Sequence, residues 1–99
     1  MNEQRKNQRF QLRLPFEIVS GGSTLRASGE TRNMSSAGVL FTSSQPVPVG
    51  EPIEYLITFP KAPGARAEVR LRCVGKVVRE DTDLAAFAAT LERYEFLRA

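Results

Sequence analysis

The 99-residue sequence contains no histidine and only one cysteine, Cys73. Zinc sites require several cysteine or histidine ligands, so a metal site is not expected. The absence of histidine also removes the commonest general base and the usual partner that activates a nucleophile. We therefore expect no enzyme, no metal and no cofactor. A single cysteine also excludes an internal disulfide, and Cys73 lies in the apolar run 69–74, where we expect a buried small side chain rather than a reactive thiol.

Long apolar runs are also missing. No segment approaches the ~20 apolar residues of a transmembrane helix. The first nine residues contain no hydrophobic segment and do not resemble a signal peptide. The sequence therefore predicts a cytoplasmic location and no membrane insertion.

The charge of the chain is modest but uneven. The net charge is +3, and the first 13 residues contain four basic side chains against Glu3 alone; these are Arg5, Lys6, Arg9 and Arg13. A concentrated basic end indicates an anionic partner, although a solvated basic tail would have the same composition.

Alternation of apolar and polar residues dominates the chain after residue 10. Residues 1–10 have few apolar groups and are predicted to form a flexible N-terminal leader, followed by one folded domain over residues 11–99. The period-two pattern predicts strands from residue 11 to 18 and over 24–32, 53–59 and 66–79, and the apolar run at 39–42 is expected to be a further short strand. Between them, residues 33–38 are rich in Asn, Ser and Gly and are expected to form a structured turn. Gly75 is expected to mark a bulge or bend.

The last segment has two interpretations. Helix propensity favours an alanine-rich helix over residues 84–93, whereas closure of an open sheet favours a strand there. We predict the strand, followed by a short turn or helical end from Tyr94. Six short strands joined by turns predict an all-β domain, either an antiparallel barrel or a sandwich.

Two short motifs lie on either side of the first two predicted strands. Arg5 and Arg9 form an RxxxR pattern, and Asn33, Ser35 and Gly38 form an NxSxxG pattern. Guanidinium groups match phosphate and the O6/N7 edge of guanine in bidentate fashion. In order and separation, the pair resembles the signature of PilZ domains, the bacterial receptors for cyclic di-GMP. The resemblance extends over nearly the whole chain, and it also favours the final strand.

The resemblance implies a six-stranded antiparallel β-barrel of the split-barrel type that binds cyclic di-GMP. Arg5, Arg9, Asn33, Ser35 and Gly38 would be the ligand-binding residues. Many members have Asp where this chain has Asn33, so contacts to guanine N–H groups should be weaker. Arg32 and Arg79 are weaker candidates for phosphate contacts, and Lys6 and Arg13 lie outside the motif. The implied function is a signalling module that responds to cyclic di-GMP and acts on a protein partner.

Two other functions remain open. A PilZ-type adaptor could bind a protein alone, although such adaptors usually lack the arginine motif. A small β-barrel could bind single-stranded nucleic acid, which requires exposed aromatic side chains. Because Phe16, Phe41, Tyr55 and Phe59 lie on the apolar phase of their strands, we expect no binding of DNA or RNA.

Overall fold

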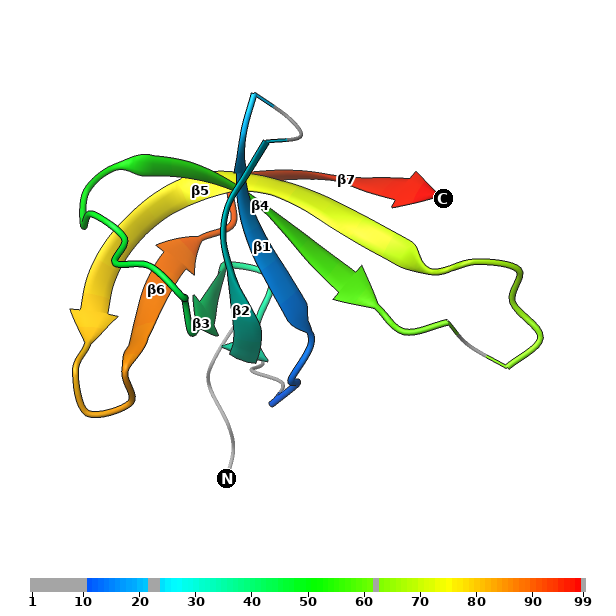
Figure 1. Cartoon of the computed structure of the whole chain (residues 1–99), viewed down its shortest axis with the longest axis horizontal. Helices are drawn as coiled ribbons and strands as arrows, with labels where there is room; N and C mark the ends of the chain where they lie inside the picture. The colour runs from blue at the N-terminus through cyan, green and yellow to red at the C-terminus, as the bar shows by residue number, and fades with distance from the viewer. Residues whose placement is uncertain (1–10, 22–23, 62, 99) are drawn as a thin grey trace.

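The computed structural model describes residues 11–21, 24–61 and 63–98 (Figure 1). These residues form seven β-strands and no helix. The strands are β1 (Pro15–Ser20), β2 (Thr24–Met34), β3 (Gly38–Phe41), β4 (Pro52–Phe59), β5 (Val69–Asp81), β6 (Ala86–Thr90) and β7 (Arg93–Arg98). The arginines of the RxxxR motif and the predicted leader lie outside the described residues.

The first six strands close into an antiparallel barrel. Their order is β4-β1-β2-β3-β6-β5, and pairing of β5 with β4 completes the ring. The long β5 arches across the molecule in Figure 1 and makes this closure possible. Its first half pairs with β4 over residues 69–76, and its second half pairs with β6 over residues 77–81. The predicted all-β fold and antiparallel barrel are confirmed.

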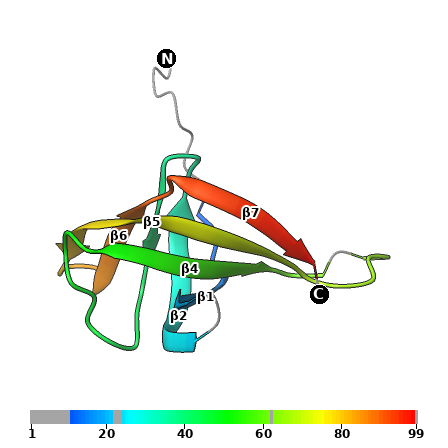
Figure 2. The ribbon, with the colours of Figure 1, turned by 90° about the horizontal axis from the view of Figure 1, so that it is seen from above.

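The predicted helical end after Tyr94 is wrong. Residues 93–98 form β7, which pairs with residues 69–74 of β5. Figure 2 shows β7 alongside β5, with β4 on the other side of β5. β6 pairs only with the second half of β5, so on that side the backbone N–H and C=O groups of the first half of β5 lack a partner strand. Residues 93–98 supply this partner. Six residues are too few for a stable isolated helix, so strand pairing prevails.

Aromatic side chains fill the barrel. The rings of Phe16 and Phe41 stack with centroids 4.1 Å apart, and Tyr55 stacks on Phe16 at 5.0 Å. All three are almost completely buried, as their place on the apolar phase predicts. Phe59 is only partly buried, and Tyr94 and Phe96 on β7 are exposed.

Two glycines allow barrel strands to approach their neighbours closely. A Cβ added at Gly29 would lie 2.0 Å from the carbonyl oxygen of Thr42, and one at Gly75 would lie 1.8 Å from that of Thr90. The Thr90 carbonyl also accepts a hydrogen bond of 2.9 Å from the Tyr55 hydroxyl. Gly75 is therefore a point of close approach, and the bulge of β5 lies three residues later, at Val78.

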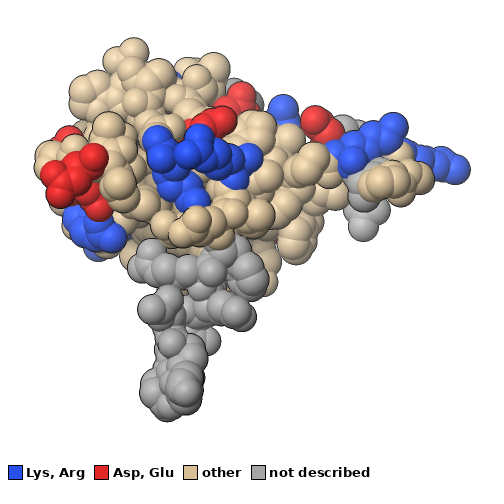
Figure 3. All heavy atoms as spheres, turned by 90° about the horizontal axis from the view of Figure 1, so that it is seen from below, with Lys and Arg blue, Asp and Glu red and all other residues tan. Residues whose placement is uncertain are grey.

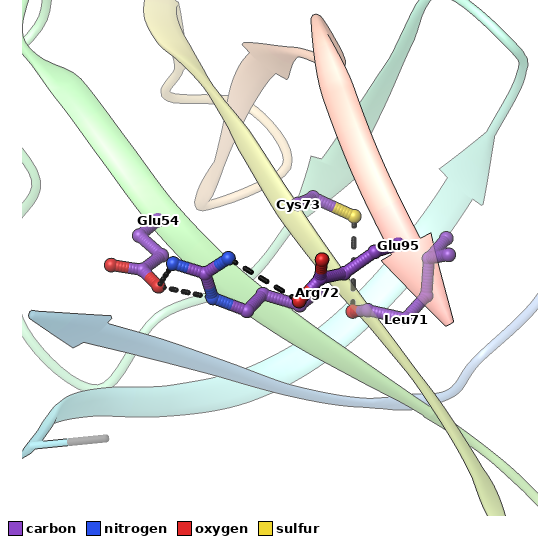
Figure 4. Close-up of polar contacts among 5 residues, drawn as sticks. All are labelled: Glu54, Leu71, Arg72, Cys73 and Glu95. Carbon is purple, nitrogen blue, oxygen red and sulfur yellow. Dashed lines mark hydrogen bonds and ion pairs between the residues drawn. The ribbon is translucent and has the colours of Figure 1, made fainter. Parts of the chain in front are cut away.

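Arg72 links the three strands β4, β5 and β7 on the outer surface. Its guanidinium lies 2.5 Å from a Glu54 carboxylate oxygen and 3.5 Å from one of Glu95 (Figure 4). About a third of the Arg72 side chain is exposed, so water screens these pairs and each stabilises the fold by at most ~1 kcal/mol.

The thiol of Cys73 should be unreactive in the folded protein. It is fully buried beside the Leu71 carbonyl (Figure 4), and burial raises its pKa to about 12 although the Tyr55 hydroxyl acts in the opposite direction. The thiolate is the nucleophile. We expect no labelling by a thiol reagent at pH 8 until denaturant unfolds the chain. Labelling of the native protein at the rate of a free thiol would contradict this placement.

The raised pKa of Cys73 also means that the protein becomes less stable at high pH. The unfolded thiol has a pKa near 9.0, whereas the folded one titrates near 12. The contribution of Cys73 to stability is thus fully present below pH 9 and is lost as the pH rises from about 9 to 12. Cys73→Ala should flatten this part of the stability profile.

Ala85 has a strained backbone in the turn between β5 and β6. Its φ is +52°, in the left-handed region that costs L-residues other than glycine roughly 1–2 kcal/mol. Ala85→Gly should therefore raise the free energy of unfolding. The gain should be only about 0.5–1 kcal/mol, because the greater conformational freedom of glycine in the unfolded chain offsets part of the relieved strain. Urea denaturation measures this change. A loss of stability would show that the methyl group makes contacts that outweigh the strain.

Within the described part of the chain, no helix has the length and hydropathy needed to cross a membrane. Nor do these residues gather three or more potential metal ligands in one place.

Candidate ligand-binding face

The turn between β2 and β3 holds the second sequence motif. β2 continues to Met34, so the turn is shorter than predicted and consists of residues 35–37. The Ser35 amide donates to the Gly38 carbonyl at 2.9 Å, and the Ala37 amide donates to Ser35 Oγ at 3.1 Å. The second bond uses a lone pair of the hydroxyl, so Ser35 keeps its hydrogen for donation to a ligand.

A β-bulge in β2 sets the direction of Asn33. Thr31 pairs with Phe41 and Asn33 pairs with Leu40, which leaves Arg32 as the extra residue. Strict alternation would place Asn33 on the same inward face as the buried Thr31. The bulge instead lets Arg32 and Asn33 line the same outer pocket.

Gly38 is needed because β3 and β6 approach closely, and its φ is not positive. A Cβ added there would lie 2.6 Å from the carbonyl oxygen of Ala89. The glycine is therefore required here by the close approach of the two strands and not by a left-handed backbone angle. Substitution of Gly38 disturbs barrel packing, so loss of ligand binding in such a variant would not identify a contact.

A second bulge lies across the same sheet, on β5. Val77 pairs with Ala89 and Arg79 pairs with Ala88, so Val78 is the extra residue. Arg79 therefore faces the same pocket as the motif residues. It pairs with Asp81 at 3.6 Å, but half of its side chain is exposed and the pair is weak. An anionic ligand could therefore replace Asp81 as its partner.

Two adjoining pockets hollow this face. The smaller, of about 200 Å³, is bounded by the turn, β3, β6 and the bulge of β5, and its lining includes Asn33, Ser35, Gly38, Val78 and Arg79. The larger, of about 460 Å³, is lined by Gln11, Arg13, Arg32, Asn33, Leu40 and Leu84. Asn33 and Leu40 belong to both pockets. We call the two together the bulge face.

The bulge face is basic where it meets the start of the described chain. Arg13 and Arg32 line the larger pocket, and none of the described residues that line it is a carboxylate. The Arg32 Nε atom is buried and has no hydrogen-bond partner among the described residues. Lys and Arg side chains also form one group near the centre of the molecular face in Figure 3.

Thr31 fixes the segment that enters this face from the N-terminal side. It is fully buried, and its hydroxyl oxygen accepts a hydrogen bond of 2.9 Å from the Leu14 amide while its hydrogen is donated to the Leu12 carbonyl. The Thr31 amide also donates to the Leu14 carbonyl at 2.9 Å. Residues 12–14 are thus fastened to β2 next to its bulge, although they lie before β1 and are not part of the strand predicted from residue 11.

The structure brings together Asn33, Ser35 and Gly38, as the motif predicts, and places Arg79 in their pocket. Arg5 and Arg9 lie outside the described residues. Arg13, which the sequence places outside the motif, lines the adjoining pocket with Arg32. The signal for Arg79 is the pair of valines that precedes it, because apolar residues on both faces of a strand can accompany a bulge. No comparable signal marks Arg13.

Comparison with known proteins decides the family. The model of the PilZ domain matches residues 3–96. The chain belongs to the PilZ domain family. This PilZ domain is also similar to a solved structure, that of the inhibitor of motility MotI/DgrA of Bacillus subtilis, with a TM-score of 0.61 and 19% sequence identity. That similarity covers 95% of this chain but 44% of the other, so the domain spans less than half of that protein. No curated protein matches the chain significantly.

Proposed function

We propose that this PilZ domain is a cytoplasmic receptor module for cyclic di-GMP that carries out no catalysis. Arg5, Arg9, Asn33, Ser35 and Gly38 would form the binding site, and the bound ligand would change the conformation presented to a protein partner. The observation that carries the proposal is the gathering of Asn33, Ser35 and Gly38 at one pocket opposite Arg79.

The chemistry of this pocket suits such a ligand. Asn33 offers a carbonyl acceptor for guanine N–H groups, and Ser35 offers a hydroxyl donor for a phosphate oxygen. Arg79 adds a positive charge on the opposite strand. Thr31 holds residues 12–14 beside the same face, so the start of the described chain has a fixed position next to the pocket.

Calorimetric titration with cyclic di-GMP tests the proposal. Arg5→Ala and Arg9→Ala should each weaken binding by roughly 1–3 kcal/mol, because each removes a bidentate or stacking contact. Ser35→Ala should weaken binding while reducing stability by only about 0.5–1.5 kcal/mol. Lys6→Ala is the charge control and should have little effect, whereas Arg13 is unsuitable as a control because it lines the bulge face. Equal losses in the Arg5, Lys6 and Arg9 variants would indicate bulk electrostatics and contradict the motif assignment.

A specific observation keeps the protein-binding adaptor as a second candidate. β7 ends the order of strands and pairs with β5 alone among the described strands, while Tyr94 and Phe96 are exposed beside an apolar groove. An exposed strand edge with aromatic side chains can accept an extended peptide. The same aromatics could stack on bases, so titration with a single-stranded oligonucleotide should accompany the cyclic di-GMP experiment. Binding of the oligonucleotide alone would favour the nucleic-acid alternative.

A further inference from the structure

We propose that Arg32 is a further anion-binding residue of the bulge face and that, with Arg13, it binds a phosphate group of the ligand in the larger pocket. The inference rests on the proposed function for the identity of the ligand and adds a contact outside both motifs. It would make Arg32, the residue inserted by the bulge, part of the binding site.

The burial of Arg32 is the first reason. Arg32 is partly buried, and its Nε atom is buried without a hydrogen-bond partner in the described part of the chain. An N–H group of a charged side chain that is removed from water without an acceptor is costly. Exchange for an apolar side chain of similar length would relieve that cost, so an arginine at this position indicates a function other than stability.

The charge of the pocket is the second reason. Arg13 and Arg32 line it together, and the other described residues that line it are Gln11, Asn33, Leu40 and Leu84. Two guanidinium groups that line one pocket give it a positive charge, which favours an anionic group there. The planar array of guanidinium donors matches the oxygens of a phosphate in bidentate fashion, so a phosphate group satisfies both arginines.

The connection between the two pockets is the third reason. Asn33 lines both, so a ligand that contacts Asn33 and Ser35 can extend directly into the larger pocket. A cyclic dinucleotide has two phosphates, and the larger pocket would receive the phosphate that Ser35 and Arg79 do not contact.

Arg32→Met tests the proposal, because methionine keeps a long unbranched chain but has neither charge nor donors. We expect the Kd for cyclic di-GMP to rise by about tenfold or more, the range of a lost charged hydrogen bond. The free variant should be as stable as the wild type or more stable, because the buried Nε is gone. Arg32→Lys should restore part of the affinity. Arg26→Met is the matched control, since Arg26 is exposed on the same strand and should leave the Kd unchanged.

Inorganic phosphate provides a probe that does not depend on cyclic di-GMP. At equal ionic strength, phosphate should raise the melting temperature of the wild type relative to chloride, and Arg32→Met should abolish this difference. If the wild type does not bind cyclic di-GMP but shows this Arg32-dependent effect, the proposed function fails and the anion site stands. If Asn33→Ala loses cyclic di-GMP while Arg32→Met binds it normally, the role of Arg32 is overturned and the proposed function stands. A stability loss in Arg32→Met with an unchanged Kd would likewise show that Arg32 is structural.

Discussion

Gly75→Ala is expected to lower the free energy of unfolding by about 3 kcal/mol or more, the upper end of the cost of overpacking. The new methyl group would lie 1.8 Å from the carbonyl oxygen of Thr90 and 2.7 Å from its carbonyl carbon. Both are backbone atoms, so β5 and the end of β6 would have to separate. That movement would also strain the hydrogen bond from the Tyr55 hydroxyl to Thr90 and the one from the Lys76 amide to Thr90 Oγ1.

Gly21→Ala is the control for this experiment. An added Cβ at Gly21 meets no atom of the described residues within 4 Å, and the φ of +63° makes backbone strain the main cost, roughly 1–2 kcal/mol. Urea denaturation followed by circular dichroism would compare the two variants. Equal losses of stability at Gly21 and Gly75 would mean that β5 and Thr90 do not approach as closely as described.

Thr31→Val is expected to lower the free energy of unfolding by about 2–3 kcal/mol. Valine has nearly the same shape but cannot accept the Leu14 amide or donate to the Leu12 carbonyl. Leu14 is buried, so its amide would be left without a partner in an environment with little water, which costs roughly 1–3 kcal/mol. Under the proposed function, cyclic di-GMP affinity should also fall, because residues 12–14 connect Arg9 to the bulge face.

Thr42→Val is the matched control for Thr31. Its hydroxyl accepts the Glu30 amide at 3.1 Å in an exposed position, where water can replace it, and the loss should be about 0.5 kcal/mol. Denaturation measures stability, and titration with cyclic di-GMP measures affinity. If the two variants lost equal stability, Thr31 would not be the anchor of the segment before β1.

The strands β1, β2, β4 and β5 could be predicted from the sequence because each contains the alternation that burial of one face requires. β3 and β6 are short and mostly apolar, and the strand at β6 was predicted from the need to close the sheet and from the family resemblance. The burial of Phe16, Phe41, Tyr55 and Cys73 followed from the same pattern. β7 could not be predicted, because its formation depends on where β6 stops along β5, a property of the pairing and not of residues 93–98. The exposure of Tyr94 and Phe96 follows from that added strand, which lies outside the closed ring.

The site was predictable to the extent that the motif names Asn33, Ser35 and Gly38. Their common face was not predictable, because simple alternation from Thr31 points Asn33 into the barrel. The bulge at Arg32 falls among polar residues and leaves no hydrophobic signature. The reason for Gly38 was also hidden, since a sequence does not show that the Ala89 carbonyl of a distant strand passes beside it.

The two bulges have a consequence for the way such a domain can diversify. Each corresponds to a single codon, and each inserted residue, Arg32 or Val78, has no cross-strand partner to constrain its side chain. Selection can therefore exchange these two residues while the interior remains constant. Deletion of either inserted residue would restore regular alternation. The side chain of the next residue, Asn33 or Arg79, would then point into the apolar interior of the barrel. A change of length at either bulge would thus disturb the barrel interior, whereas a change of the inserted side chain would alter only the outer surface.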